Sequence, residues 1–196
     1  MRRWFLLLML MFGFQSPLVA QRRPAASRSA ATRVILVRHA EKRTDNPLEL
    51  NPHLTAEGQV RASQLFHAVK GYDVRAVIIT QFRRTRETAA FTAESLGIQP
   101  VVVRTQGKGN RNATDIARLI RGRFAGQTVL VVGHQTTIPR IIRALGGPQM
   151  GDLCKEAYSN VFVLELRPNA APALTRLHYG AADPPDDEDC VAGIRQ

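Results

Sequence analysis

The stretch VILVRHAEK, residues 34–42, joins a run of apolar residues to a cluster of charged and ionisable side chains. The run is continuous and rich in branched residues, which is typical of a strand buried on both faces. It ends in Arg38 and His39, and Glu41 follows after one residue. A guanidinium beside an imidazole at the end of a buried strand suits the binding of an anion, with the histidine placed to react with it.

Similar apolar runs recur along the chain, at residues 74–80, 101–104 and 128–132, and two later strand-like segments lie at 161–166 and 174–179. Segments with helical periodicity separate the earlier runs, at 55–69, 85–96, 114–121 and from 137 to the glycines at 146 and 147. Thr55 and Thr137 are suited to cap two of these helices. The alternation predicts a doubly wound α/β fold, a three-layer sandwich with a mostly parallel central sheet.

The first predicted helix has an amphipathic pattern. Val60, Leu65, Phe66 and Val69 recur at helical spacing within residues 55–69. We therefore expect these four side chains on the face that packs against the sheet.

Ionisable side chains follow three of the predicted strands. Arg38 and His39 follow the first, the segment TQFRRTRETA at 80–89 follows the second, and His134 follows the strand at 128–132. Because the carboxyl ends of parallel strands meet at one edge of a sheet, we expect two histidines and at least two arginines to converge there. Arginines bind phosphate through paired hydrogen bonds, and a neutral imidazole nitrogen can accept a phosphoryl group. Neighbouring cations would keep His39 neutral.

Four blocks carry a family resemblance, namely VILVRHAEK, LTAEGQVRASQL, TQFRRTRETAA and VVGHQTTIPRIIRALGG. Together they resemble the histidine phosphatase superfamily (branch 1), which has the phosphoglycerate-mutase-like fold, over residues 33–180. The resemblance implies that His39 is the phosphorylated nucleophile and that His134 is the second catalytic histidine of the pocket. It also implies that Arg38 and Arg84 bind the phosphate. Arg83 and Arg86, beside Arg84, are equally compatible with a solvated helix surface.

The same resemblance implies a metal-independent phosphoric monoester hydrolase of the histidine acid-phosphatase type, without a cofactor, that works through a phosphohistidine. Its substrate would be a small phosphorylated molecule or a phosphoprotein. The third block departs from the family pattern at Thr80, Gln81, Thr85 and Glu87, where members usually have Ser, Pro, Ala and Gln. A non-catalytic module that binds phosphate or a phosphorylated ligand is the alternative, because the general acid of many members has no match in this chain.

Many members of the superfamily also carry a carboxylic acid that protonates the leaving oxygen, and no residue of this chain matches it. Glu41 is the candidate for this acid, with Asp45 nearby and Asp115 more remote. If no fixed acid is present, we expect a preference for substrates with good leaving groups, such as acyl phosphates, aryl phosphates or phosphohistidine.

The N-terminus has the features of an export signal. Arg2 and Arg3 precede an almost wholly apolar run at 4–14, and Ala20 is a small residue suited to cleavage. We expect residues 1–20 to be a signal peptide, 21–32 a disordered linker, 33–180 the domain and 181–196 an acidic, solvated tail. The mature protein would be periplasmic or secreted, without stable membrane insertion. An uncleaved membrane anchor is the alternative, although the run is short for a span.

Cysteine content and charge bear on compartment and partners. The chain has two cysteines, Cys154 and Cys190, and in an exported protein such a pair favours a disulfide over two free thiols. The formal net charge of +11 raises the question of nucleic acid or cell-envelope binding. The arginines are scattered and no aromatic residues interleave with them, so we expect no nucleic-acid partner.

Overall fold

The computed structural model describes residues 31–105, 110–185, 190–191 and 194–195. The predicted signal peptide lies outside these ranges, as does the predicted linker except for its last two residues. Strand β1 begins at Thr32, which pairs with Leu166, one residue before the predicted start of the domain at Arg33.

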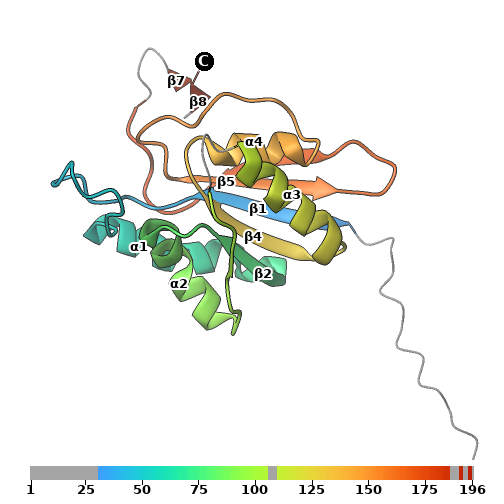
Figure 1. Ribbon diagram of the computed structural model, residues 1–196, viewed down its shortest axis with the longest axis horizontal. Helices are drawn as coiled ribbons and strands as arrows, with labels where there is room; N and C mark the ends of the chain where they lie inside the picture. The colour runs from blue at the N-terminus through green and yellow to red at the C-terminus, as the bar shows by residue number, and fades with distance from the viewer. Residues whose placement is uncertain (1–30, 106–109, 186–189, 192–193, 196) are drawn as a thin grey trace, which may run out of the picture.

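A six-stranded sheet forms the centre of the domain, in the order β3-β2-β4-β1-β5-β6 (Figure 1). The strands β1, β2, β3 and β4 run parallel, whereas β5 is antiparallel to both of its neighbours. The bounds are β1 (Thr32–Arg38), β2 (Val74–Ile79), β3 (Val101–Val102), β4 (Thr128–Gly133), β5 (Asn160–Leu166) and β6 (Ala173–His178). The predicted α/β fold with a mostly parallel sheet is confirmed.

The described helices are α1 (Ala56–Val69), the single turn η1 (Lys70–Tyr72), α2 (Arg83–Ser95), α3 (Asn110–Arg123) and α4 (Thr137–Ala144). Thr55 caps α1 as predicted, because its hydroxyl accepts a hydrogen bond from the Gly58 N–H at 3.1 Å. Gly97, with φ of +63°, follows the end of α2, in the left-handed region that glycine adopts readily. None of these helices has both the length and the apolar character needed to cross a bilayer.

The helices cover both faces of the sheet, so the domain has three layers (Figure 1). Alternate residues of β1 face opposite layers: Val34 and Leu36 pack in the core beneath α3 and α4, and Ile35 and Val37 pack beneath α1 and α2. Burial on both faces explains why β1 is an unbroken apolar run rather than an alternating one.

Helix α1 differs from its predicted pattern at one turn. Leu65 and Val69 are buried as expected and Phe66 only partly, but Val60 is 56% exposed, and the neighbouring Arg61 is only 5% exposed. The Arg61 guanidinium is buried because acceptors surround it: the Glu41 carboxylate and the carbonyl oxygens of Tyr179 and Ala181. Paired charges and satisfied donors make such burial possible.

The chain end is fastened to the domain. Cys154 and Cys190 form a disulfide, so the predicted pairing is confirmed. The short strands β7 (Cys190–Val191) and β8 (Ile194–Arg195) pair with each other, and Leu153 forms a bridge to Ile194.

The expectation of a solvated tail fails at its start. The Asp183 carboxylate accepts hydrogen bonds from the Tyr158 and Ser159 N–H groups, both at 2.8 Å, and from the Ser159 hydroxyl at 2.7 Å. A carboxylate that satisfies two backbone donors has a structural role, so this part of the tail belongs to the domain.

Candidate active site

A pocket of about 610 Å³ opens at the carboxyl ends of β1, β2 and β4. Its walls include Arg38, His39, Lys42, Arg84, His134 and Arg140, together with Phe82 and the first turn of α4. The structure thus brings together four residues that were predicted from the sequence to share one site, namely Arg38, His39, Arg84 and His134. The parallel alignment of β1 with β4, which pairs Arg38 with Gly133, places the two histidines side by side.

His39 follows the last residue of β1 and is only 4% exposed. Its backbone N–H donates to the Gly133 carbonyl at 2.9 Å, and its Nδ1 lies 2.8 Å from the Ala40 carbonyl oxygen. A carbonyl can only accept, so Nδ1 carries the ring proton and Nε2 of the neutral ring keeps its lone pair. Burial lowers the pKa of His39 well below its ordinary range; the hydrogen bond to Ala40 opposes the shift, and the charges of Arg38 and Arg84 add to it.

Two backbone carbonyl groups and one aromatic ring hold the Arg38 side chain in place. Its Nη1 donates to the carbonyl oxygens of Cys154 at 2.9 Å and Lys155 at 2.7 Å. Its guanidinium carbon lies 4.1 Å from the centre of the Tyr158 ring, a cation–π contact. The buried Arg38 Nε has no hydrogen-bond partner among the described residues. A rigid guanidinium with an unused donor beside a pocket is suited to bind a phosphate oxygen.

Arg84 is the second residue of α2, directly after the loop that leaves β2. Its guanidinium carbon lies 4.3 Å from the centre of the Phe82 ring, and its buried Nε likewise lacks a partner in the described part of the chain. Gln81 fixes the loop, because its side-chain amide donates to the Thr105 hydroxyl at 2.9 Å and its oxygen accepts from the Thr105 N–H at 2.9 Å. The loop is therefore anchored although its sequence departs from the family pattern.

His134 follows β4, and its ring centre lies 5.4 Å from that of His39. Its Nε2 is 3.0 Å from the Thr80 hydroxyl, and its backbone N–H donates to the Thr137 hydroxyl at 2.9 Å. The buried Nδ1 has no partner among the described residues. Burial, reinforced by the charges of Arg84 and Arg38, lowers the pKa of His134 to about 3, so both histidines of the pocket are neutral at neutral pH.

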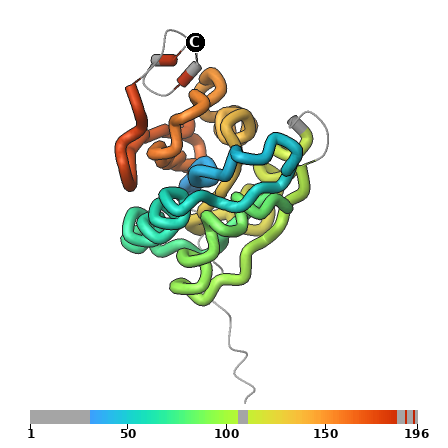
Figure 2. The backbone as a smooth tube through the Cα atoms, turned by 90° about the vertical axis from the view of Figure 1, so that its left-hand side faces the viewer, coloured from blue at the N-terminus to red at the C-terminus, as the bar shows by residue number. Residues whose placement is uncertain are grey.

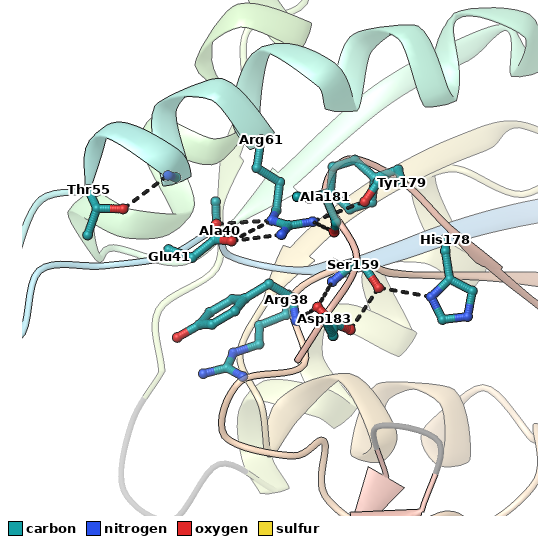
Figure 3. A network of polar contacts seen from close by, with 12 residues as sticks. Arg38, Ala40, Glu41, Thr55, Arg61, Ser159, His178, Tyr179, Ala181 and Asp183 are labelled. Carbon is teal, nitrogen blue, oxygen red and sulfur yellow. Dashed lines mark hydrogen bonds and ion pairs between the residues drawn. The ribbon is translucent and has the colours of Figure 1, made fainter. Parts of the chain in front are cut away.

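Glu41, the candidate acid, does not line the pocket. Its carboxylate forms an ion pair with Arg61, with contacts of 2.7 to 3.0 Å from Nη2 and Nε (Figure 3). Asp45 pairs with Arg43 at 2.7 Å on the surface. The other carboxylate considered, Asp115, is paired with an arginine on α3. No carboxylate of the described residues lines the pocket, so the structure brings none of these acids to the reacting centre.

The segment between β1 and α1 lies beside the start of α2 (Figure 2). The Arg83 N–H donates to the Asn51 side-chain oxygen at 2.8 Å, and the Leu54 N–H donates to the Glu87 carboxylate at 2.8 Å. The other carboxylate oxygen of Glu87 pairs with His53. Glu87 therefore ties this segment to α2, while Arg83 is an exposed residue outside the pocket wall.

No group of three or more His, Cys, Asp or Glu side chains in the described ranges is arranged to hold a metal ion.

Comparison with known proteins bears on the family of the chain. Residues 34–106, which contain the first three sequence blocks, match the family model described as histidine phosphatase superfamily (branch 1). The predicted family resemblance is confirmed. No curated protein sequence matches the chain.

Solved structures of phosphatases share the fold. SixA from Nakamurella multipartitia, described as a candidate phosphohistidine phosphatase, is 24% identical, with a TM-score of 0.56 over 78% of this chain and 98% of that one. A candidate alpha-ribazole-5'-P phosphatase from Escherichia coli is 17% identical, with a TM-score of 0.57 over 75% and 96%. The mycobacterial glucosyl-3-phosphoglycerate phosphatase is 14% identical, with a TM-score of 0.57 over 76% and 99%. At these identities the likeness shows the fold.

Four residues of the site were not predicted from the sequence. Lys42 and Arg140 line the pocket, Tyr158 lies beneath Arg38, and the Thr88 hydroxyl accepts from the Ala40 N–H at 2.9 Å. Arg140 had a usable signal, because it lies one turn after the helix start that follows His134. Tyr158 had none, since its contact with the pocket depends on the path of a loop.

Proposed function

We propose that the protein is a phosphohydrolase that cleaves phosphomonoesters through a phosphohistidine at His39. The pocket is the observation that supports this proposal most directly. In it, the buried neutral ring of His39, whose Nε2 keeps its lone pair, lies among two anchored arginines and a second neutral histidine. Phosphoryl transfer needs positioning and charge neutralisation, and this arrangement supplies both.

In the proposed reaction, Arg38 and Arg84 bind the non-bridging oxygens and orient the phosphorus toward His39. The Nε2 lone pair attacks phosphorus, and the bond to the leaving oxygen breaks with its electron pair. In the proposed reaction the Thr80 hydroxyl donates to His134 Nε2, which places the ring proton on Nδ1, where it can be donated to a phosphate oxygen. Water then attacks the phosphohistidine, the N–P bond returns its electrons to Nε2, and phosphate is released.

The proposed leaving-group preference follows from the lack of a carboxylate in the described pocket wall. Without a positioned acid, the leaving oxygen must depart as an anion, so the rate depends on its basicity. We expect kcat to fall steeply with rising leaving-group pKa across a series of aryl phosphates. A flat series would show that an acid is present.

The central test is turnover of para-nitrophenyl phosphate by the chain without residues 1–20, with a chelator in the buffer. We expect the wild type to release nitrophenol and His39→Ala to lose at least about a thousandfold in rate, the scale of a lost nucleophile. The low pKa of His39 supports activity that persists at acidic pH, as an acid-type phosphatase requires. Turnover that His39→Ala retains would refute the mechanism.

A non-catalytic phosphate-binding module is the second candidate, favoured by the same missing carboxylate. It would bind inorganic phosphate in calorimetry and turn over no ester. The two functions are separated by running calorimetry and turnover on the same preparation.

We also propose that the protein is exported and acts in the periplasm or outside the cell. The disulfide supports this, because structural disulfides persist in oxidising compartments. The test is N-terminal sequencing of the mature product, which should begin after Ala20. A product that retains Met1 would refute cleavage.

A further inference from the structure

Arg38, the first arginine of the proposed phosphate site, is supported by one short segment of the chain. Its Nη1 donates to the carbonyl oxygens of Cys154 and Lys155, and its guanidinium carbon lies 4.1 Å from the centre of the Tyr158 ring. These are the only hydrogen bonds and ring contacts that its side chain makes with described residues. We call residues 154–159 the support segment. The place of the Arg38 guanidinium therefore depends on the place of this segment.

The support segment has no regular secondary structure of its own. Residues 154–159 lie in neither a helix nor a strand, and β5 begins only at Asn160. A single turn, in which the Ala157 N–H donates to the Cys154 carbonyl oxygen at 3.1 Å, folds its first half. Backbone groups outside regular structure need partners from elsewhere, so other parts of the chain must fix its second half.

The Asp183 carboxylate fixes the second half with both of its oxygens (Figure 3). Oδ1 accepts from the Tyr158 and Ser159 N–H groups, both at 2.8 Å, and Oδ2 accepts from the Ser159 hydroxyl at 2.7 Å. Hydrogen bonds to an ionised acceptor are the strong ones, and Ser159 is buried. Asp183 makes no hydrogen bond or ion pair with Arg38 in the part of the chain that the structure describes. Any effect of its hydrogen bonds on the arginine therefore passes through the support segment.

The disulfide fixes the other end of the same segment, because it joins Cys154 to Cys190. Asp183 and Cys190 both lie beyond residue 180, where the sequence suggested a solvated tail. They also lie beyond residue 106, where the match to the family model ends. The end of the chain thus holds the support segment at both ends, and the support segment holds Arg38.

We propose that Asp183 is a positioning residue for phosphate binding: its carboxylate holds the support segment where the segment presents the Arg38 guanidinium to the phosphoryl group. The inference rests on the proposed function, in which Arg38 binds the phosphoryl oxygens, and adds to it a residue outside the pocket wall. Position matters at such a site, because a displacement of about 1 Å that originates far from the reacting atoms can cost about a hundredfold in rate.

The first test measures the Kd of inorganic phosphate by calorimetry, without reductant, on chains that lack residues 1–20. We expect Asp183→Ala to weaken binding by about tenfold or more, the scale of one or two lost charge-assisted hydrogen bonds. Asp183→Asn should restore part of the affinity, because its side-chain oxygen can still accept the two N–H groups.

Thr32→Val is the matched control for the loss of a side-chain acceptor. The Thr32 hydroxyl accepts from the Gly126 N–H at 2.8 Å, but it lies at the start of β1, whereas Arg38 lies at the end. This variant should leave the phosphate Kd unchanged. A Kd for Asp183→Ala that equals the wild-type value would overturn the proposal.

A double-mutant cycle shows whether Asp183 acts through Arg38. NMR titration with phosphate, which reaches weak affinities, compares Arg38→Met with the double variant Arg38→Met, Asp183→Ala. Without the Arg38 guanidinium, the loss of Asp183 should weaken binding no further. An equal loss with and without this guanidinium would overturn the proposal, because it would show a general loss of structure.

Phosphate binding requires no turnover, so the positioning role and the hydrolase can fail separately. Phosphate affinity that depends on Asp183, in a protein that hydrolyses no ester, would retain the positioning role and refute the hydrolase. Turnover of para-nitrophenyl phosphate with equal kcat/KM in the wild type and in Asp183→Ala would retain the hydrolase and refute the positioning role.

Discussion

Acid should destabilise the fold through the second histidine of the pocket. The pKa of His134 is lowered from its ordinary value of 6.5 to about 3, chiefly by burial. Below pH 6.5 the unfolded chain takes up a proton at this site, whereas the folded chain remains neutral there. The free energy of unfolding therefore falls as the pH drops from 6.5 toward about 3. The stabilisation that comes from the neutral folded-state His134 is fully present only above pH 6.5.

The size of the effect follows from these two pKa values. Between about pH 7.5 and about pH 5, proton linkage at His134 alone removes about 2 kcal/mol from the free energy of unfolding. The pKa of His39 is lowered for the same main reason, so its contribution has the same sign. A loss of this size is a substantial part of the stability of an ordinary domain.

The measurement is urea denaturation of the wild type and of His134→Gln at both pH values, in buffers free of phosphate because a bound anion would stabilise the folded state. The variant has no titrating group at this position. The unfolding free energy of the wild type minus that of the variant should therefore be about 2 kcal/mol lower at the lower pH than at the higher pH. An equal difference at both pH values would refute the argument that burial holds His134 neutral.

Three further predictions concern the surroundings of the pocket. Replacing Cys154 and Cys190 together by serine should lower the free energy of unfolding by about 4 kcal/mol, because the disulfide closes a loop with a sequence separation of 36. Urea denaturation measures this loss, and an unchanged denaturation midpoint would contradict the prediction. Gly58→Ala should lower the free energy of unfolding by about 1 to 3 kcal/mol in the same assay, since the new Cβ would lie 2.2 Å from the Glu41 carbonyl oxygen. A loss below about 0.5 kcal/mol would show that the backbone shifts easily to relieve the contact. Tyr158→Leu should weaken phosphate binding by about tenfold in calorimetry by removing the ring beneath the first arginine clamp, with an unaltered Kd as the contrary outcome.

The main elements were predictable because the apolar runs are continuous, but not every helix start was: α3 begins at Asn110 and not at 114, and Thr137, expected to cap α4, is its first residue. The run at 34–37 lies within β1, and Thr55 caps α1. The convergence of Arg38, His39, Arg84 and His134 was predictable too, because parallel strands bring their carboxyl ends to one edge. This argument needs only strand order and direction.

Long-range partners were not predictable. The helical pattern placed Val60 inside, but Arg61 occupies the buried face because carbonyl groups 118 and 120 residues away satisfy its guanidinium. Arg61 also forms an ion pair with the Glu41 carboxylate. Glu41 therefore does not line the pocket, although its closeness to His39 in the sequence suggested that it would. A local pattern cannot show a charge that distant residues neutralise.

The anchoring of Arg38 has a consequence for the order in which the site is completed during biosynthesis. Its carbonyl partner on Cys154 lies 116 residues farther along the chain. A nascent chain that ends before this residue already contains both histidines and both arginines, yet it lacks the two carbonyl groups and the aromatic ring that contact Arg38 in the described structure. Phosphate affinity should therefore appear only after most of the polypeptide has been made and about its last fifth, from Cys154 onward, has docked, so incomplete chains would remain inactive.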